Sequence, residues 1–177
     1  MANVWRIAIL LLVTLAALPA VARAQEPRVS IAGGYVYLQQ QAAGNLPSAS
    51  YPFGWMGTAG FRLGASRVSA VGEFGISWQA NDFDERQQLM AVLGGASVTL
   101  FRSNRVAIFA QGLAGLERFS EPGLVESGVA VQPGGGIDFY VSSKVFIRGQ
   151  GDYRWSEANG STFHAFRLVA AVGIAIK

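Results

Sequence analysis

Few residues in this chain could carry chemistry, and the candidates are carboxylates and one histidine. Glu73 and Asp138 could act as a general acid and base if they lay together, because paired carboxylates hold different protonation states. His164 could act as a base beside a serine or an aspartate. No pattern marks a nucleophile or a bound substrate, so we interpret both carboxylates as ion-pair partners of arginines. The apolar neighbours of His164, Phe163 and Phe166, favour an interfacial position over a catalytic one.

Other motifs for catalysis or ligand binding are missing from the sequence. The chain has no cysteine, which excludes disulfides and thiolate sites. The glycine run at 134–136 lacks the lysine and the following helix of a phosphate-binding loop, so close packing explains it better. No histidine or carboxylate spacing fits a metal ion. We therefore predict that the protein has no metal and no cofactor, and that it is not an enzyme.

The charged residues lie on segments in which polar and apolar side chains alternate. In 145–155 one parity carries Arg148, Gln150, Asp152 and Arg154, and the other is mainly apolar. A period of two is that of a β-strand with two different faces. Eight such segments, separated by turn residues, predict an all-β protein. They span about 28–39, 51–63, 68–79, 88–101, 106–118, 132–141, 145–155 and 162–177.

The connections between these segments alternate in length. Short turns are expected at 64–67, 103–105 and 142–144, and longer loops at 40–50, 80–87, 119–127 and 156–161. Basic residues gather at the short turns and acidic residues at the long loops. An even number of strands with all the short turns at one end predicts an eight-stranded antiparallel up-and-down barrel. Pro133 cannot donate to a strand ladder, so we expect a bulge or a lost hydrogen bond near 133–136.

The first 24 residues have the features of a cleavable signal peptide. Arg6 precedes an apolar run, and residues 22–24 read Ala-Arg-Ala before Gln25. An N-terminal membrane anchor is the alternative. We therefore predict a barrel domain over 25–177. Removing the two arginines of the signal from the 14 basic residues leaves 12 against 11 acidic ones, so the basic balance does not indicate a nucleic-acid partner.

Alternation alone does not decide which face of the strands is inside. A soluble lipocalin-like calyx would enclose the apolar face, whereas a small membrane barrel would enclose the polar one. Aromatic residues at the long-loop ends predict an outer interfacial belt. Buried charges must be paired, and the polar face carries four arginines and four acids, although a solvated sheet face remains the alternative. The belt comprises Tyr35, Tyr37, Phe53, Trp55, Trp78, Tyr153 and Trp155, and the lumen charge network comprises Arg62, Arg148, Arg154, Arg167, Glu73, Glu117, Asp138 and Asp152.

With these residues in place, the sequence resembles small bacterial outer-membrane barrels of the OmpA/OmpX-like class, the outer membrane protein beta-barrel domain proteins. The resemblance covers the chain after the signal peptide. It is carried by GWMGTAGFRL at 54–63, VGEFGISW at 71–78, QPGGGIDF at 132–139 and VFIRGQGDYRW at 145–155. It implies an eight-stranded barrel in the outer membrane that is usually not an enzyme.

The sequence therefore predicts a structural or surface-interaction protein, with a lumen plugged by arginines and carboxylates and with exposed outer loops. The expected partners are outer-membrane lipids, lipopolysaccharide and, during insertion, the barrel-assembly machinery. We expect a monomer that binds no nucleic acid. Three alternatives remain: a narrow porin-like channel for small solutes, a lipid-modifying barrel enzyme, and a soluble lipocalin-like binder.

Overall fold

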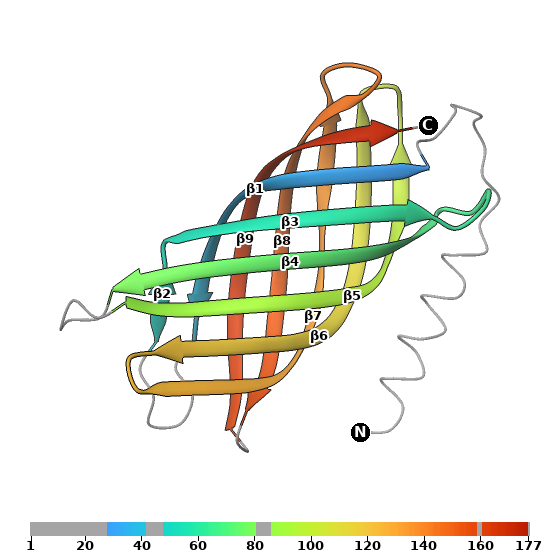
Figure 1. Cartoon of the computed structure of the whole chain (residues 1–177). Coiled ribbons are helices and arrows are strands. Elements are labelled where there is room, and N and C mark those ends of the chain that lie inside the picture. Colours follow the sequence, from blue (N-terminus) through green and yellow to red (C-terminus); the bar gives the residue numbers. More distant parts are fainter. Residues whose placement is uncertain (1–27, 42–47, 81–85, 159–160, 177) are drawn as a thin grey trace.

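The computed structural model describes residues 28–41, 48–80, 86–158 and 161–176, which form one tilted, closed sheet (Figure 1). The predicted signal peptide at 1–24 lies outside this range. The described residues form nine antiparallel strand segments: β1 (Val29–Gln40), β2 (Ala49–Tyr51), β3 (Phe53–Arg62), β4 (Val68–Ala80), β5 (Arg86–Arg102), β6 (Val106–Glu121), β7 (Leu124–Tyr140), β8 (Val145–Ala158) and β9 (Ser161–Ile176). None of the described residues belongs to a helix that is long and apolar enough to cross a membrane.

The sheet closes because the first strand pairs with the last. β1 and β9 are hydrogen-bonded neighbours along twelve residue pairs, from Val29 with Ile176 to Gln40 with Ala165. β2 and β3 both pair with β1, and from β3 to β9 each strand pairs with the next one in sequence. Closure removes the unpaired edges that would otherwise expose hydrogen-bonding groups.

Nine segments make eight barrel strands, because β2 and β3 are two parts of one strand. Both pair with β1, but Leu38 faces Tyr51 whereas Tyr35 faces Trp55, so the register shifts by one residue. Pro52 stands at the shift, where its missing N–H is tolerated as in other bulges. The predicted eight-stranded antiparallel barrel is confirmed.

Of the two alternatives expected at Pro133, a bulge or a lost hydrogen bond, the structure has no bulge but an interrupted ladder. Val131 faces Trp155 and Gly134 faces Asp152, which is the same register on both sides of the proline. The ladder to β8 is interrupted between these pairs but not shifted. Glycine is required beside it for packing: a Cβ on Gly134 would collide with the carboxylate of Asp152. The glycine run thus keeps β7 close to β8 while the proline omits one donor.

The predicted long loop at 119–127 is also wrong. β6 and β7 stay paired as far as Glu121 and Leu124, and only Pro122 and Gly123 connect them. Gly123 has a φ of 82°, the value needed at the third residue of a type II turn, for which proline is favoured at the second. β8 and β9 likewise pair as far as Ala158 and Ser161, beyond the predicted strand ends. Turn chemistry and pairing partners, rather than hydrophobic alternation, set these ends.

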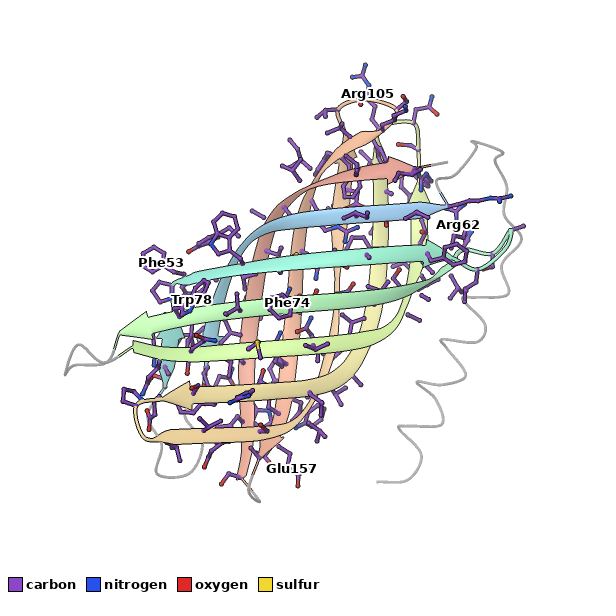
Figure 2. All side chains as sticks on the ribbon, viewed as in Figure 1. Phe53, Arg62, Phe74, Trp78, Arg105 and Glu157 are labelled. Carbon is purple, nitrogen blue, oxygen red and sulfur yellow. The ribbon has the colours of Figure 1, made fainter. Side chains whose placement is uncertain are left out.

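The two faces of the strands separate cleanly. Along β9 buried and exposed residues alternate from Ala165 to Ile176, with Arg167 inside and Leu168 outside. Phe53 and Phe74 are exposed on the outer surface of the barrel (Figure 2). The outward-facing strand residues are therefore mainly apolar, whereas buried charged residues such as Arg167 face the lumen.

Candidate functional site: the barrel lumen

The structure places the eight candidate lumen charges on the inner side of the barrel, but not in one cluster. Arg154, Arg167, Glu73, Glu117 and Asp152 form a network in the middle of the lumen. Arg148 and Asp138 form a separate pair nearer the short-turn end. Arg62 lines a cavity at that end. The eight charges are therefore divided between the middle of the lumen and its short-turn end, where Arg148 and Asp138 line the same cavity as Arg62.

Arg167 is the centre of the middle level and is only 1% exposed. Its Nη1 lies 2.6 Å from Oε1 of Glu73 and 3.4 Å from Oδ2 of Asp152. Asp152 is its neighbour on the adjacent strand, whereas Glu73 comes from β4 on another side of the barrel. Burial makes each of these charges costly unless it is paired, and the pairing ties non-adjacent strands together across the lumen.

Gln132 connects the two arginines of this level and is completely buried. Its Oε1 accepts hydrogen bonds from Nε and Nη2 of Arg154, at 2.9 and 2.7 Å, and its Nε2 donates to Glu73 at 3.1 Å. Arg154 also donates to Oε2 of Glu117 at 2.8 Å. A continuous chain of contacts therefore runs through the lumen from Glu117 to Arg167.

Two more glutamines complete the middle level. Gln111 and Gln150 both donate to the Asp152 carboxylate, at distances from 2.9 to 3.2 Å. The sequence analysis placed Gln150 on the polar parity but assigned none of the glutamines to the network. The signal was available, because they share strand and parity with the charges. We name these eight residues the central network: Glu73, Gln111, Glu117, Gln132, Gln150, Asp152, Arg154 and Arg167.

The Arg148–Asp138 pair is a bidentate ion pair of cross-strand neighbours. Nε and Nη2 of Arg148 donate to the two carboxylate oxygens at 2.7 and 2.9 Å. The guanidinium also lies 4.5 Å from the ring centroid of Phe109 and 5.3 Å from that of Phe146. Such cation–π contacts add to the fixed fork geometry. This pair lies between the central network and the short turns, in the lining of the cavity at that end.

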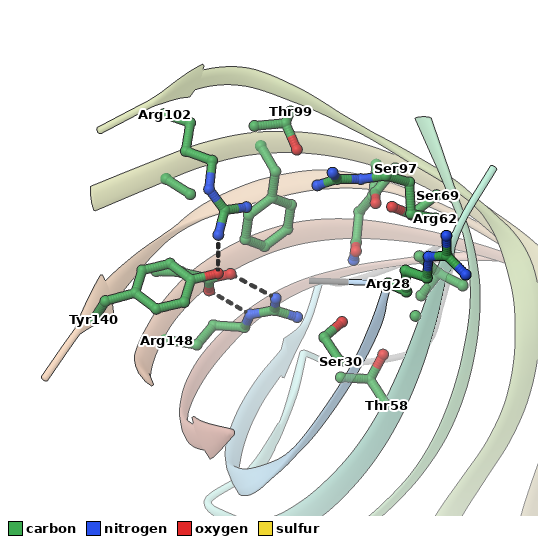
Figure 3. Close-up of a pocket in the computed structure, with 16 residues that line it drawn as sticks. Arg28, Ser30, Thr58, Arg62, Ser69, Ser97, Thr99, Arg102, Tyr140 and Arg148 are labelled. Atoms are coloured by element: carbon green, nitrogen blue, oxygen red, sulfur yellow. Dashed lines mark hydrogen bonds and ion pairs between the residues drawn. The ribbon is translucent and has the colours of Figure 1, made fainter. Parts of the chain in front are cut away.

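A cavity of about 70 Å³ lies at the short-turn end of the lumen (Figure 3). We name it the basic cavity. Arg102 donates from Nη2 to the Tyr140 hydroxyl at 3.0 Å and stacks over its ring, with 5.0 Å to the centroid. Several hydroxyl side chains complete the wall. Its polar lining consists of Arg28, Ser30, Thr58, Arg62, Ser69, Ser97, Thr99, Arg102, Gln111, Asp138, Tyr140 and Arg148.

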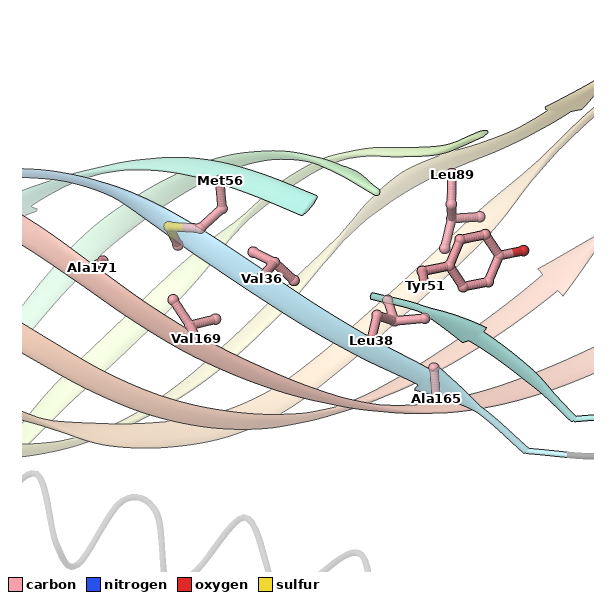
Figure 4. Close-up of a cluster of buried hydrophobic side chains, with 8 residues drawn as sticks. All are labelled: Val36, Leu38, Tyr51, Met56, Leu89, Ala165, Val169 and Ala171. Atoms are coloured by element: carbon pink, nitrogen blue, oxygen red, sulfur yellow. The ribbon is translucent and has the colours of Figure 1, made fainter. Parts of the chain in front are cut away.

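The lumen also contains a cluster of buried apolar side chains toward its long-loop end, which the sequence did not predict. Tyr51 and Leu89 pack there in one buried cluster with the strand residues around them (Figure 4). Tyr51 points inward because the register shift at Pro52 reverses the parity of β2. Above the cluster a recess of about 730 Å³ opens, with Glu117, Glu121 and Glu126 in its wall. The buried cluster is Val36, Leu38, Tyr51, Met56, Leu89, Ala165, Val169 and Ala171.

The seven candidate belt residues lie near the long-loop ends of their strands. Five are exposed outside the barrel: Tyr35, Phe53, Trp55, Tyr153 and Trp155. Tyr37 and Trp78 are half-buried. Tyr35 faces Trp55, and Phe53 faces Trp78, on adjacent strands. A second outward group at the other end, which the sequence analysis missed, contains only phenylalanines: Phe61, Phe101 and Phe139.

The contacts of His164 are aromatic. Its Nδ1 lies 2.9 Å from the Tyr153 hydroxyl, and its ring centroid lies 5.8 Å from that of Trp155. Glu73, the other candidate for chemistry, is engaged with Arg167 and Gln132. Among the described residues no three histidine or carboxylate side chains are grouped to hold a metal ion. The described polar contacts of Glu73 and His164 are therefore with other residues of the lumen and of the aromatic belt, respectively.

Searches against protein-family models and curated protein sequences found no match. Two solved structures resemble the chain closely in shape. Neisserial surface protein A (NspA) superimposes with a TM-score of 0.71 at 13% identity, over 84% of this chain and 97% of NspA. The attachment invasion locus protein Ail of Yersinia pestis gives a TM-score of 0.55 at 17% identity, over 84% of this chain and 99% of Ail.

The chain has the fold of these small outer-membrane barrels. A second structure of Ail, in complex with the heparin analogue sucrose octasulfate, gives a TM-score of 0.54 at 16% identity, over 84% of this chain and 99% of Ail. At these identities the likeness concerns the fold. The resemblance to eight-stranded outer-membrane barrels drawn from the sequence is confirmed at that level.

Proposed function

We propose that the protein is an integral barrel of the bacterial outer membrane, closed to solutes, that acts through surface interactions at its long-loop end and not as an enzyme. The observation that carries this proposal is the inversion of polarity between the two faces. The outer face is apolar, whereas Arg167, Asp152 and Gln132 are almost fully enclosed. A soluble calyx requires the opposite arrangement.

The dimensions of the barrel support the same conclusion. A membrane-spanning strand needs about 9–11 residues. β5 and β7 have 17 residues each, and β6 and β9 have 16, so they are long enough to extend beyond the bilayer. Aromatic residues at both ends of the apolar band match the two girdles of such barrels. The Trp and Tyr group marks the long-loop side, and the phenylalanine group marks the short-turn side.

A charge on the outer surface tests the membrane location. Val92 is 56% exposed midway along β5, and Leu124 is exposed at the tip of the β6–β7 hairpin. In a bilayer, Val92→Arg should cost about 2–4 kcal/mol of unfolding free energy, and Leu124→Arg about 0–1 kcal/mol. The measurement is urea-induced unfolding in lipid vesicles. The folded fraction is monitored by the shift in gel mobility that boiling produces. Equal tolerance of both variants, or recovery of folded protein in the soluble fraction, would exclude the proposal.

Closure to solutes follows from the central network, whose contacts cross the lumen. The wild-type barrel should show no sustained current steps in planar bilayers. A variant that replaces Glu73, Gln132 and Arg167 together by serine removes the cross-lumen contacts and should conduct. Steady current through the wild type would show that the lumen is a pore instead.

We assign the surface interactions to the recess at the long-loop end of the lumen. Its wall combines Phe119 and Phe163 with Glu121 and Glu126. Carboxylates repel the phosphates of lipopolysaccharide unless a divalent cation bridges them, since Mg²⁺ prefers such oxygen ligands. Binding of lipopolysaccharide to the refolded barrel should therefore require Mg²⁺ and fall on chelation. Glu121→Gln together with Glu126→Gln should remove that requirement, and binding that never responds to Mg²⁺ would contradict this role of the acids.

A further inference from the structure

We propose that the basic cavity at the short-turn end of the lumen binds a small tetrahedral oxyanion of the phosphate or sulfate class. The proposal goes beyond the plugged-barrel function, because it concerns the opposite end of the lumen and does not require the membrane location. It rests on the charge of the cavity, on the register of its lining residues and on its size.

The charge of the cavity is strongly one-sided. Four arginines line it, from different strands or strand ends, and the described lining residues include one carboxylate, Asp138. Arg148 already holds both oxygens of that carboxylate. Arg62 has other interactions in the structure. An excess of positive charge remains even without Arg62, because Arg28 and Arg102 line the cavity beside the Arg148–Asp138 pair, whose two charges cancel. The described contact of Arg102 is with the neutral Tyr140 hydroxyl and ring.

The register places like charges side by side. The amide of Arg62 donates to the carbonyl of Arg28 at 2.8 Å, so the two arginines face each other on adjacent strands. Like charges directly opposite each other destabilise a sheet. Beyond Arg62 the same level continues through Ser69 on β4 and Ser97 on β5, which are also cross-strand partners. Two guanidinium groups followed by two hydroxyls form an arc of hydrogen-bond donors.

Arg102 and Arg148 provide donors on the other side of the cavity (Figure 3). The guanidinium fork suits oxyanions, because its N–H groups can donate in pairs to two oxygens. The low-dielectric wall of a barrel also concentrates the field of these charges inside it. The same arrangement would repel a cation and would not retain an apolar ligand.

The volume sets the size of the anion. One water molecule takes up about 10–15 Å³ of such a cavity. The cavity of about 70 Å³ therefore has room for roughly five water molecules. A phosphate or sulfate ion has five heavy atoms. A nucleotide or a sugar phosphate is too large to enter as a whole, although a terminal phosphate group could.

The test is phosphate binding by the refolded barrel in dodecyl maltoside, a detergent without phosphate, at constant ionic strength. Calorimetric titration with inorganic phosphate should give saturable binding with one site. Arg102→Gln and Arg28→Gln should each weaken it by about 10- to 100-fold, the loss expected for one charge-assisted hydrogen bond. Arg105→Gln and Lys144→Gln are the matched controls. They remove the same charge from exposed turns at the same end, outside the lining, and should change the affinity about twofold or less.

Failure has a distinct signature. Absence of saturable binding, or equal losses in the turn controls, would overturn the proposal. A lipid headgroup is the other source of the same chemistry, so binding is repeated in nanodiscs with and without phosphatidylglycerol. If only the anionic lipid binds and free phosphate does not, the lumen site is excluded.

A further variant keeps the test independent of loss of folding. Ser97→Asp places a carboxylate within the arc and should both abolish phosphate binding and raise the urea midpoint, because it supplies the missing anion. Ser97→Asn is its neutral control. A lower midpoint for the aspartate variant than for the asparagine variant would show that the cavity has no cationic excess.

Discussion

The central network and the basic cavity are made of the same kinds of residue, yet they differ in how their charges are balanced. In the central network Arg154 and Arg167 are each held by a carboxylate, and glutamine amides make further hydrogen bonds to Arg154, Glu73 and Asp152. In the basic cavity arginines outnumber acids, and most of the neutral polar lining residues carry hydroxyls, Gln111 being the one amide side chain in the described lining. The network is enclosed, whereas the cavity lies at an opening of the barrel.

The difference shows what enclosure does to a charge. A buried ion without a partner costs several kcal/mol, so the middle of the lumen contains only charges with partners inside the chain. Near the opening, water and mobile ions can compensate a charge. The chain can therefore leave an excess of positive charge there. We propose that this excess recruits an anion from outside, and that the central network stabilises the barrel and closes its lumen.

The strongest way to break this contrast is to remove the central arginine. Arg167→Leu leaves Glu73 and Asp152 enclosed without their cation, and should cost about 3–5 kcal/mol of unfolding free energy. Urea titration with the heat-dependent mobility shift measures this cost. Glu157→Gln, on an exposed residue of β8, is the control and should change little. A cost below that of the cavity variants would mean that the two regions do not differ as described.

A smaller effect is expected from the amide that links the network. Gln132→Leu removes the acceptor of Arg154 and a donor to Glu73 while keeping a similar volume. Hydrogen bonds to charged groups contribute about 1.5–3 kcal/mol each. The ion pairs of Arg154 and Glu73 remain in the variant, so we expect it to lose about 1.5 kcal/mol of unfolding free energy. Gln132→Glu should separate charge from shape: it keeps the acceptor for Arg154 but repels Glu73. Recovery of wild-type stability in Gln132→Glu would contradict this description of the network.

The smallest effect is expected in the basic cavity. Arg102→Gln removes a charge that is bonded only to Tyr140 among the described residues, and its amide can still donate to that hydroxyl. The unfolding free energy in phosphate-free buffer should change by less than about 1 kcal/mol. Added phosphate should stabilise the wild type and not the variant. Equal stabilisation of both proteins by phosphate would contradict the proposed functional difference between the basic cavity and the central network.

Much of the barrel could be predicted from the sequence, because a strand has a fixed side-chain period. The parity of Arg148, Asp152 and Arg154 placed them on one face, and the turn residues gave the approximate strand limits. The predicted strand limits were wrong where pairing with a neighbouring strand, and not the local sequence, determines where a strand ends. Phe119 and Val125 stay in the sheet because their partners continue, and the type II turn at Gly123 needs only two residues.

The sequence by itself determined the alternation of faces, the number of barrel strands and which residues share the polar face, since these follow from local periodicity. Only the tertiary structure decided which of those residues meet. Closure of the sheet brings Glu73 to Arg167, although they are 94 residues apart, and it places Arg62 in the lining of the basic cavity instead of the central network. The shift at Pro52 turns Tyr51 inward. Partners across a lumen depend on register and closure, and neither is encoded in the period of a single strand.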